Sequence, residues 1–382
     1  MPEKENTADT LTRHFTACNL EDSLVLSDGD TMLLILNPAG RRVWEGLMEG
    51  VDPKKIAEEM AEEFDTPVGE VEPFVTSLVT SLLSHASREP ERQSGPMKKI
   101  PSPPSPHGVH TYALYGKSLQ VRYGNALAET ALHPLLRHAE TSKKRSSGKP
   151  PITCEFIQNA DESYTFAIDG IEKVREASIV YVKGVAVFEI FSALHPDRSW
   201  LAVFHGAAVK RDDRASLLLG KSGDGKSTLA AALSKNGFDL MSDDLAVIEK
   251  GSVGVMETPF ALALKKGSWE VLSPLIPEIP GLPRATLFDE TLAFFAPSPV
   301  SSTLPSPDPV QALYFVRYDP GTPFRVTGLT AVEALSRLTE AGAWISHEKE
   351  NLEAFLAWLG ETPAYELHYS DLSPVIDLLS KA

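Results

Sequence analysis

Residues 220–228 have the residue types and the spacing of a phosphate-binding loop. They read Gly-Lys-Ser-Gly-Asp-Gly-Lys-Ser-Thr, which fits the pattern G-x-x-x-x-G-K-S. The apolar run 215–219 predicts a strand before the loop, and residues 228–233 predict the start of a helix after it. A glycine loop between a strand and a helix directs backbone N–H groups and the helix dipole toward phosphate oxygens. We therefore expect a nucleotide to bind here.

Two side chains of this loop have specific expected roles. Lys226 would reach the β- and γ-phosphates of ATP, and the Ser227 hydroxyl would bind Mg²⁺. The other residues that we expect to contact the nucleotide are Gly220, Ser222, Gly223, Gly225 and Thr228.

Further reactive side chains lie on both sides of the loop in the sequence. The run 201–209 predicts one strand that carries His205, and Asp243 and Asp244 follow a short apolar stretch. Carboxylates at a strand end beside a phosphate loop can bind Mg²⁺ or accept a proton from an attacking hydroxyl. Adjacent residues of an extended chain point to opposite sides, so we expect the two aspartates to have different roles. The residues alone leave open which aspartate has which role.

The order of these motifs resembles the HPr kinase/phosphorylase superfamily, specifically its HPr-kinase-related serine kinases. The resemblance depends on His205-Gly206, the loop 220–227 and Ser242-Asp243-Asp244, and it covers about residues 110–382. Later segments that also look similar are residues 259–268, 312–316 and 362–367. The resemblance implies a P-loop kinase domain of the HPr kinase type that uses ATP and Mg²⁺.

The same resemblance implies roles for the individual residues. Asp243 becomes the base that accepts a proton from the substrate hydroxyl, His205 orients or polarises it, and Lys226 neutralises the transferring phosphate. Ser227 and Asp244 become the Mg²⁺ ligands, and the reverse assignment of the two aspartates stays open.

Two departures from that family favour the forward kinase reaction. Thr228 stands where HPr kinases proper have glutamate, and Lys265-Lys266-Gly267 stands near the place of their Arg-Gly-Leu-Gly signature. That signature is tied to phosphorolysis, so we expect a kinase without the reverse reaction, and one that does not act on HPr. Either lysine could assist phosphate transfer or lie in a solvated turn.

The first ninety residues predict three strands followed by three helices, a winged-helix-like α+β domain. Residues 28–30 predict a hairpin turn, and Asn37-Pro38 and Asp52-Pro53 predict two helix starts. Residues 1–12 are polar and are expected to be disordered.

The segments 29–44 and 56–78 resemble the PqqD family, small domains that hold the leaders of ribosomally made peptides. The resemblance implies that a leader adds as an extra strand to the sheet edge. DNA binding and dimerisation are the alternatives.

The sequence therefore predicts an α/β protein in three parts. These are a PqqD-like domain at 1–90, a Pro/Ser-rich linker at 91–109 and the kinase domain at 110–382. Residues 109–200 predict further strands and helices but carry no chemistry alone.

Composition limits the partners and the compartment. Of the net charge of −16, residues 1–90 hold −11 from 7 basic and 18 acidic side chains, which disfavours nucleic acid as a partner. Two cysteines, the absence of a long apolar run and a polar start predict a cytoplasmic protein without a membrane partner. A homo-oligomer is compatible with the HPr kinase resemblance.

These observations predict an ATP-dependent kinase that phosphorylates a Ser hydroxyl of a ribosomally synthesised precursor peptide. The N-terminal domain would capture the leader of that peptide and so raise the local concentration of its core at the kinase site. One alternative is a nucleotide-binding chaperone or scaffold that presents the precursor to another enzyme. Another is a kinase of a small hydroxylated metabolite.

Overall fold

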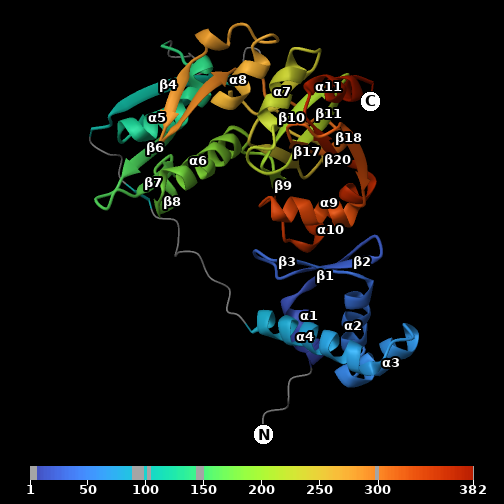
Figure 1. Ribbon diagram of the computed structural model, residues 1–382. Coiled ribbons are helices and arrows are strands. Elements are labelled where there is room, and N and C mark those ends of the chain that lie inside the picture. Colours follow the sequence, from blue (N-terminus) through green and yellow to red (C-terminus); the bar gives the residue numbers. More distant parts are fainter. Residues whose placement is uncertain (1–6, 88–98, 101–104, 143–149, 297–300, 382) are drawn as a thin grey trace. The chain divides into compact units, whose positions relative to one another are not determined.

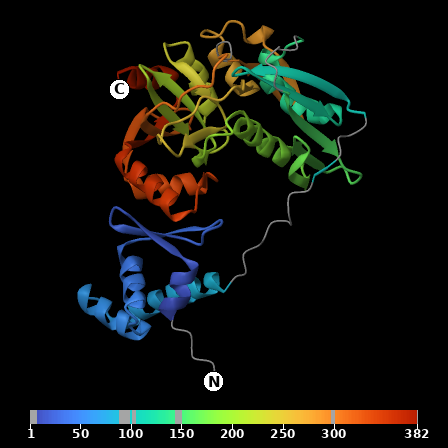
Figure 2. The same ribbon diagram turned by 180° about the vertical axis from the view of Figure 1, so that it is seen from behind.

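The computed structural model describes residues 7–87, 99–100, 105–142, 150–296 and 301–381, and Figures 1 and 2 show it from opposite sides. Its contacts divide the chain into two compact units. Unit 1 consists of Met1–Gln93, Leu329–Glu340 and Trp344–Thr362. Unit 2 consists of Ser94–Gly328, Ala341–Ala343 and Pro363–Ala382. Most of the predicted linker, residues 91–98 and 101–104, lies outside the described residues.

Unit 1 is built from a small antiparallel sheet and helices. Its elements are α1 (Thr7–His14), β1 (Thr16–Leu20), β2 (Ser23–Ser27), β3 (Leu33–Leu36), α2 (Pro38–Met48), α3 (Pro53–Glu63), α4 (Val68–Ala86), α9 (Ala331–Glu340), β19 (Trp344–Ile345) and α10 (Lys349–Glu361). The sheet has the order β1-β2-β3.

The sequence predicted the helix starts of this unit correctly. Asn37 caps α2 because its side-chain oxygen accepts a hydrogen bond from the Gly40 N–H at 2.9 Å, and Pro38 occupies the first turn. Asp52 caps α3 in the same way. Residues 1–12 were predicted to be disordered, which is wrong for residues 7–12. These residues belong to α1. The helix is held in place because Leu11 is fully buried in the hydrophobic core that the sheet shares with α1–α4.

Both faces of the unit 1 sheet are covered, which explains why all five residues of β2 are buried. Leu24 and Leu26 join the core formed with α1–α4. Ser23, Val25 and Ser27 alternate with these two residues and point to the opposite face, where Ser27 Oγ lies 2.7 Å from His347 Nδ1. Figure 1 shows α9 and α10 on that face. The Glu21 carboxylate also accepts a hydrogen bond from the first N–H of α9, Ala331, at 2.9 Å.

Unit 2 contains two larger sheets and two small ones. Its first elements are β4 (Gly108–Leu114), β5 (Lys117–Tyr123), α5 (Ala126–Leu136), η1 (Arg137–Ala139), β6 (Ile152–Gln158), β7 (Tyr164–Ile168), β8 (Ile171–Ala177) and α6 (Ile179–Leu194). These five strands form one sheet in chain order. Buried side chains of α5 and α6 form a common core with this sheet.

The remaining elements of unit 2 follow α6 in the chain. They are β9 (Trp200–Phe204), β10 (Gly206–Arg211), β11 (Arg214–Leu219), α7 (Lys226–Ser234), β12 (Asp239–Ser242), β13 (Ala246–Glu249), β14 (Leu262–Lys265), α8 (Lys266–Leu272), η2 (Ile279–Gly281), β15 (Arg284–Leu287), β16 (Glu290–Phe295), β17 (Val310–Tyr318), β18 (Arg325–Leu329, whose last residue counts with unit 1), β20 (Ala364–Tyr369) and α11 (Leu372–Lys381).

A six-stranded sheet with the order β12-β10-β11-β17-β20-β18 carries the predicted phosphate loop. The pairs β11–β17 and β17–β20 are parallel, while β10 is antiparallel to both of its neighbours. The small sheet β14-β16-β15 and the pair β9–β13 lie in the same unit. The buried side chains 229–233 of α7 and three residues of α11 pack together in the core of this sheet. The loop therefore joins a central strand to a well-packed helix.

No helix among the described residues is both long and apolar enough to cross a membrane.

Candidate functional site

The predicted phosphate loop connects β11 to α7, as the sequence indicated. The strand ends at Leu219, and the helix begins at Lys226. Gly225 precedes the helix with φ 91°, a left-handed conformation that glycine adopts without strain. A Cβ atom there would lie 2.5 Å from the Tyr369 hydroxyl oxygen. This position therefore requires glycine for two independent reasons.

The Lys226 side chain is folded back into the loop. Its Nζ donates hydrogen bonds to the carbonyl oxygens of Gly220 and Lys221, at 2.8 and 2.9 Å. Burial lowers the pKa of Lys226, against the attraction of the aspartates at 244, 224 and 243. The ammonium group thus lies within the loop, where a phosphate oxygen could replace the two carbonyl groups as its partner.

Ser227 and Asp243 are linked directly. The Ser227 hydroxyl donates to Asp243 Oδ1 at 2.8 Å, and the Ala263 N–H donates to Asp243 Oδ2 at 3.2 Å. Asp243 is buried, and this burial, followed by the nearby charge of Asp244, raises its pKa to about 7. A buried carboxylate beside the loop serine is a suitable oxygen ligand for a divalent cation.

His205 and Asp244 form a second pair, which is open to solvent. His205 Nε2 lies 3.9 Å from Asp244 Oδ1, and the two side chains are 43% and 50% exposed. Asp244 has φ 60°, so its backbone is left-handed at the turn after β12. The two adjacent aspartates thus lie in different surroundings, with Asp243 buried and Asp244 exposed.

The single strand predicted over residues 201–209 is wrong. The chain breaks at His205 into β9 and β10, which pair with different partners. β9 pairs with β13, whereas β10 lies between β11 and β12. The break at His205 follows from this change of sheet, and it leaves the imidazole exposed rather than packed on an apolar strand.

Several other residues lie in or near the loop. Asp224 Oδ2 accepts a hydrogen bond from the Lys221 N–H at 2.6 Å, and the Tyr369 hydroxyl contacts the Gly225 carbonyl at 3.4 Å. Asp224 occupies a variable position of the motif, and Tyr369 lies far along the chain, so no local signal marked them. Lys265 forms an ion pair with Glu290 at 3.0 Å. Of the predicted nucleotide contacts, Ser222 and Gly223 are exposed, and Gly220 and Thr228 are half-buried.

Comparison with known families identifies one part of the chain. Residues 23–86 match the family described as coenzyme PQQ synthesis protein D (PqqD). The protein is therefore of mixed α/β class with a PqqD domain near its N-terminus, which confirms that part of the sequence prediction. The match does not extend into residues 110–382. No curated protein matches the chain.

Proposed function

We propose that the protein is an ATP-dependent kinase that phosphorylates a Ser hydroxyl of a ribosomally synthesised precursor peptide, whose leader binds the PqqD domain. The observation that carries the proposal is the arrangement around the loop 220–228. Ser227 of the loop donates a hydrogen bond to the buried Asp243, and the next residue, Asp244, forms an exposed pair with His205. A kinase needs both, a cation site and an accessible base.

The residues of the loop fit Mg²⁺ and ATP. Ser227 and Asp243 present oxygen atoms that are 2.8 Å apart, and Lys226 offers its ammonium group within the loop. When bound, Mg²⁺ would neutralise charge on the phosphate oxygens. This fit leads us to propose Asp243, rather than Asp244, as the cation ligand beside Ser227.

Asp244 then becomes the proposed base. Its carboxylate is exposed and lies beside His205, so a peptide hydroxyl can reach it, whereas the buried Asp243 is engaged with Ser227 and Ala263. The substrate proton passes to Asp244, and the oxygen forms a bond to the γ-phosphorus of ATP. The bond to the bridging oxygen breaks, and ADP leaves. His205 positions the Asp244 carboxylate.

The PqqD domain offers a strand edge for the leader. β3 pairs with β2 on one side, and no other described strand pairs with it. Leu33, Leu34 and Ile35 are partly exposed there. The Asp28 N–H donates a hydrogen bond to the Met32 carbonyl, so Asp28 and Met32 form a hydrogen-bonded pair of the hairpin. Along β3, residues that hydrogen-bond to β2 then alternate with residues that do not. Leu34 is therefore hydrogen-bonded to β2, while the backbone N–H and C=O groups of Leu33 and Ile35 point away from β2, toward the free edge of the strand.

Replacing Ile35 with proline should therefore weaken leader binding at least about tenfold. Proline removes an outward N–H without removing a hydrogen bond to β2. The matched control, Ile35→Thr, keeps the N–H and the strand preference, and it should bind nearly as well as the parent protein. Fluorescence anisotropy of a labelled leader peptide measures both. Equal loss in the two variants would mean that the side chain, not main-chain pairing, holds the leader.

A direct assay tests the proposed activity. The full chain is incubated with Mg²⁺, γ-labelled ATP and precursor peptides encoded beside its gene, and the products are resolved by intact mass. We expect one phosphate on a serine of the peptide. If the label appears only in water, the chain would be a nucleotide-responsive scaffold instead. Transfer to a small hydroxylated metabolite but to no peptide would also overturn the proposal.

A further inference from the structure

A group of histidine and glutamate side chains gathers in unit 2, on elements of the five-stranded sheet and its covering helix. His110 comes from β4, His133 from α5 and Glu140 from the residue after η1. One potential ligand atom of each lies within 4.8 Å of the other two. His110 Nδ1 is 2.6 Å from Glu140 Oε1, and His133 Nε2 is 4.0 Å from Glu140 Oε2. No motif in the sequence brings these three residues together.

The backbone holds the three residues in place. Tyr112 of β4 forms a β-bridge with Glu140, and the Thr141 N–H donates to the Thr111 carbonyl at 2.9 Å. The glutamate is thus fastened to the strand that carries His110. The rings of His110 and His133 stack with their centroids 4.1 Å apart. The cluster is therefore a fixed arrangement of the fold rather than a chance meeting of surface side chains.

Each histidine also has a partner for its other ring nitrogen. Glu129 Oε1 lies 3.0 Å from His110 Nε2, and the Tyr112 hydroxyl lies 2.7 Å from His133 Nδ1. Such partners are the usual companions of metal-bound histidines, because they fix the orientation of the ring. Gly108 leaves the room for this arrangement, since a Cβ atom there would lie 2.5 Å from Glu129 Oε2.

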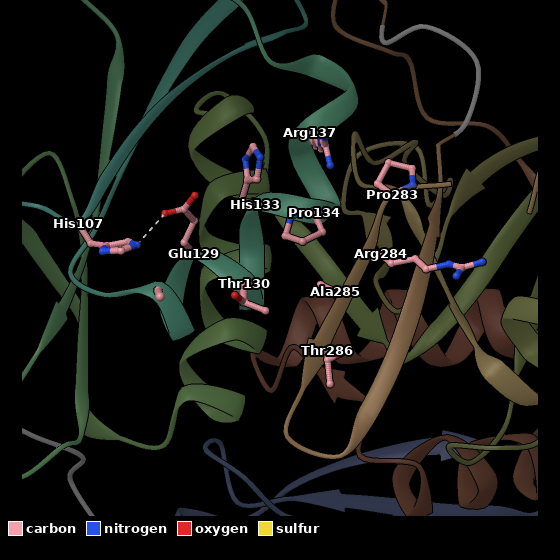
Figure 3. A pocket seen from close by; sticks show the side chains of 11 residues that line it. His107, Glu129, Thr130, His133, Pro134, Arg137, Pro283, Arg284, Ala285 and Thr286 are labelled. Carbon is pink, nitrogen blue, oxygen red and sulfur yellow. Dashed lines mark ion pairs between the residues drawn. The ribbon is translucent and has the colours of Figure 1, made fainter. Parts of the chain in front are cut away.

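We propose that His110 Nδ1, His133 Nε2 and the Glu140 carboxylate bind a divalent transition metal, with Zn²⁺ the best fit. Two imidazoles and one carboxylate form a donor set that zinc accepts, and three protein ligands leave a fourth position for water. His133 also lines a cavity of about 380 Å³, together with Glu129, Arg137 and Arg284 (Figure 3). Water from this cavity can complete the coordination. This site is separate from the loop 220–228.

The test uses the full chain, freed of metal with a chelator and titrated with Co²⁺, whose visible absorption reports ligand number and geometry. We expect one Co²⁺ per chain with a four-coordinate spectrum, and displacement of it by Zn²⁺. His133→Gln and His110→Ala should abolish this spectrum. Glu129→Gln should weaken binding about 10–100-fold, as expected for a group that orients a ligand.

Two controls separate this site from others. His107→Ala removes a histidine that lies 3.6 Å from Glu129 but is not among the three ligands, and it should retain the spectrum. Asp243→Asn, which removes the proposed cation ligand beside Ser227, should retain it as well. Zn²⁺ should also raise the melting temperature of the parent chain but not of Glu140→Gln. A chain that binds no Co²⁺, or a spectrum that survives in both histidine variants, would show that the cluster is only an ion-pair network.

Discussion

Asp244→Asn should lower the rate of phosphoryl transfer by about 10²–10⁴-fold while leaving nucleotide affinity nearly unchanged. The expectation follows from the exposure of the Asp244 carboxylate and its place beside His205. An asparagine keeps the shape of the side chain but cannot accept the proton of the substrate hydroxyl. Single-turnover transfer and equilibrium binding of an ATP analogue measure the two quantities separately.

Asp243→Asn is the matched comparison, because it makes the same chemical change one residue earlier. It should weaken Mg²⁺-dependent nucleotide binding, since this carboxylate holds the Ser227 hydroxyl at 2.8 Å. The opposite pattern would reverse the proposed assignment. In that case Asp243→Asn would abolish transfer with nucleotide binding intact, as the resemblance to HPr-kinase relatives implies.

Gly225→Ala should reduce nucleotide affinity at least about tenfold and destabilise the fold by about 1–3 kcal/mol. Alanine at φ 91° is strained, and its Cβ atom would meet the Tyr369 hydroxyl. Isothermal titration with ATP analogues and thermal unfolding report the two effects.

Two further variants distinguish strain from collision. Gly223→Ala has a similar φ of 96° but open space around its Cβ atom, so it shows the cost of backbone strain alone. Tyr369→Phe removes the colliding oxygen and should restore part of the loss in the double variant with Gly225→Ala. If that double variant is no better than Gly225→Ala, the collision with the Tyr369 hydroxyl contributes nothing, and backbone strain and the tight contact with Tyr318 Cβ at 3.2 Å explain the effect.

Local signals in the sequence predicted the parts of the fold that depend on neighbouring residues. The cap at Asn37, the hairpin turn at 28–30 and the strand, loop and helix around residues 220–228 are all present. Each arises from residues a few positions apart, where spacing alone fixes the geometry. The break at His205 was missed, because an apolar run does not reveal that the chain changes from one sheet to another.

Contacts between distant residues could not be predicted. The bond from Ser227 to Asp243 depends on how β12 and α7 pack, and the spacing of two adjacent aspartates does not show which one faces the loop. His110, His133 and Glu140 meet only because a β-bridge fastens Glu140 to β4. Because such a contact leaves no motif in the sequence, no reactive site could be predicted within residues 109–200.

The covering of the small sheet by α9 and α10 limits how the PqqD domain can be transplanted into another protein. Cys18 and Leu20 of β1 are buried, and the core shared with α1–α4 does not include them. The pKa of Cys18 is raised by burial and by Glu353 of α10, which lies on the same side of the sheet. A fragment cut at residue 90 would expose this apolar surface. A transplanted PqqD domain should therefore include residues 329–362, because the compact unit is not contiguous in the gene.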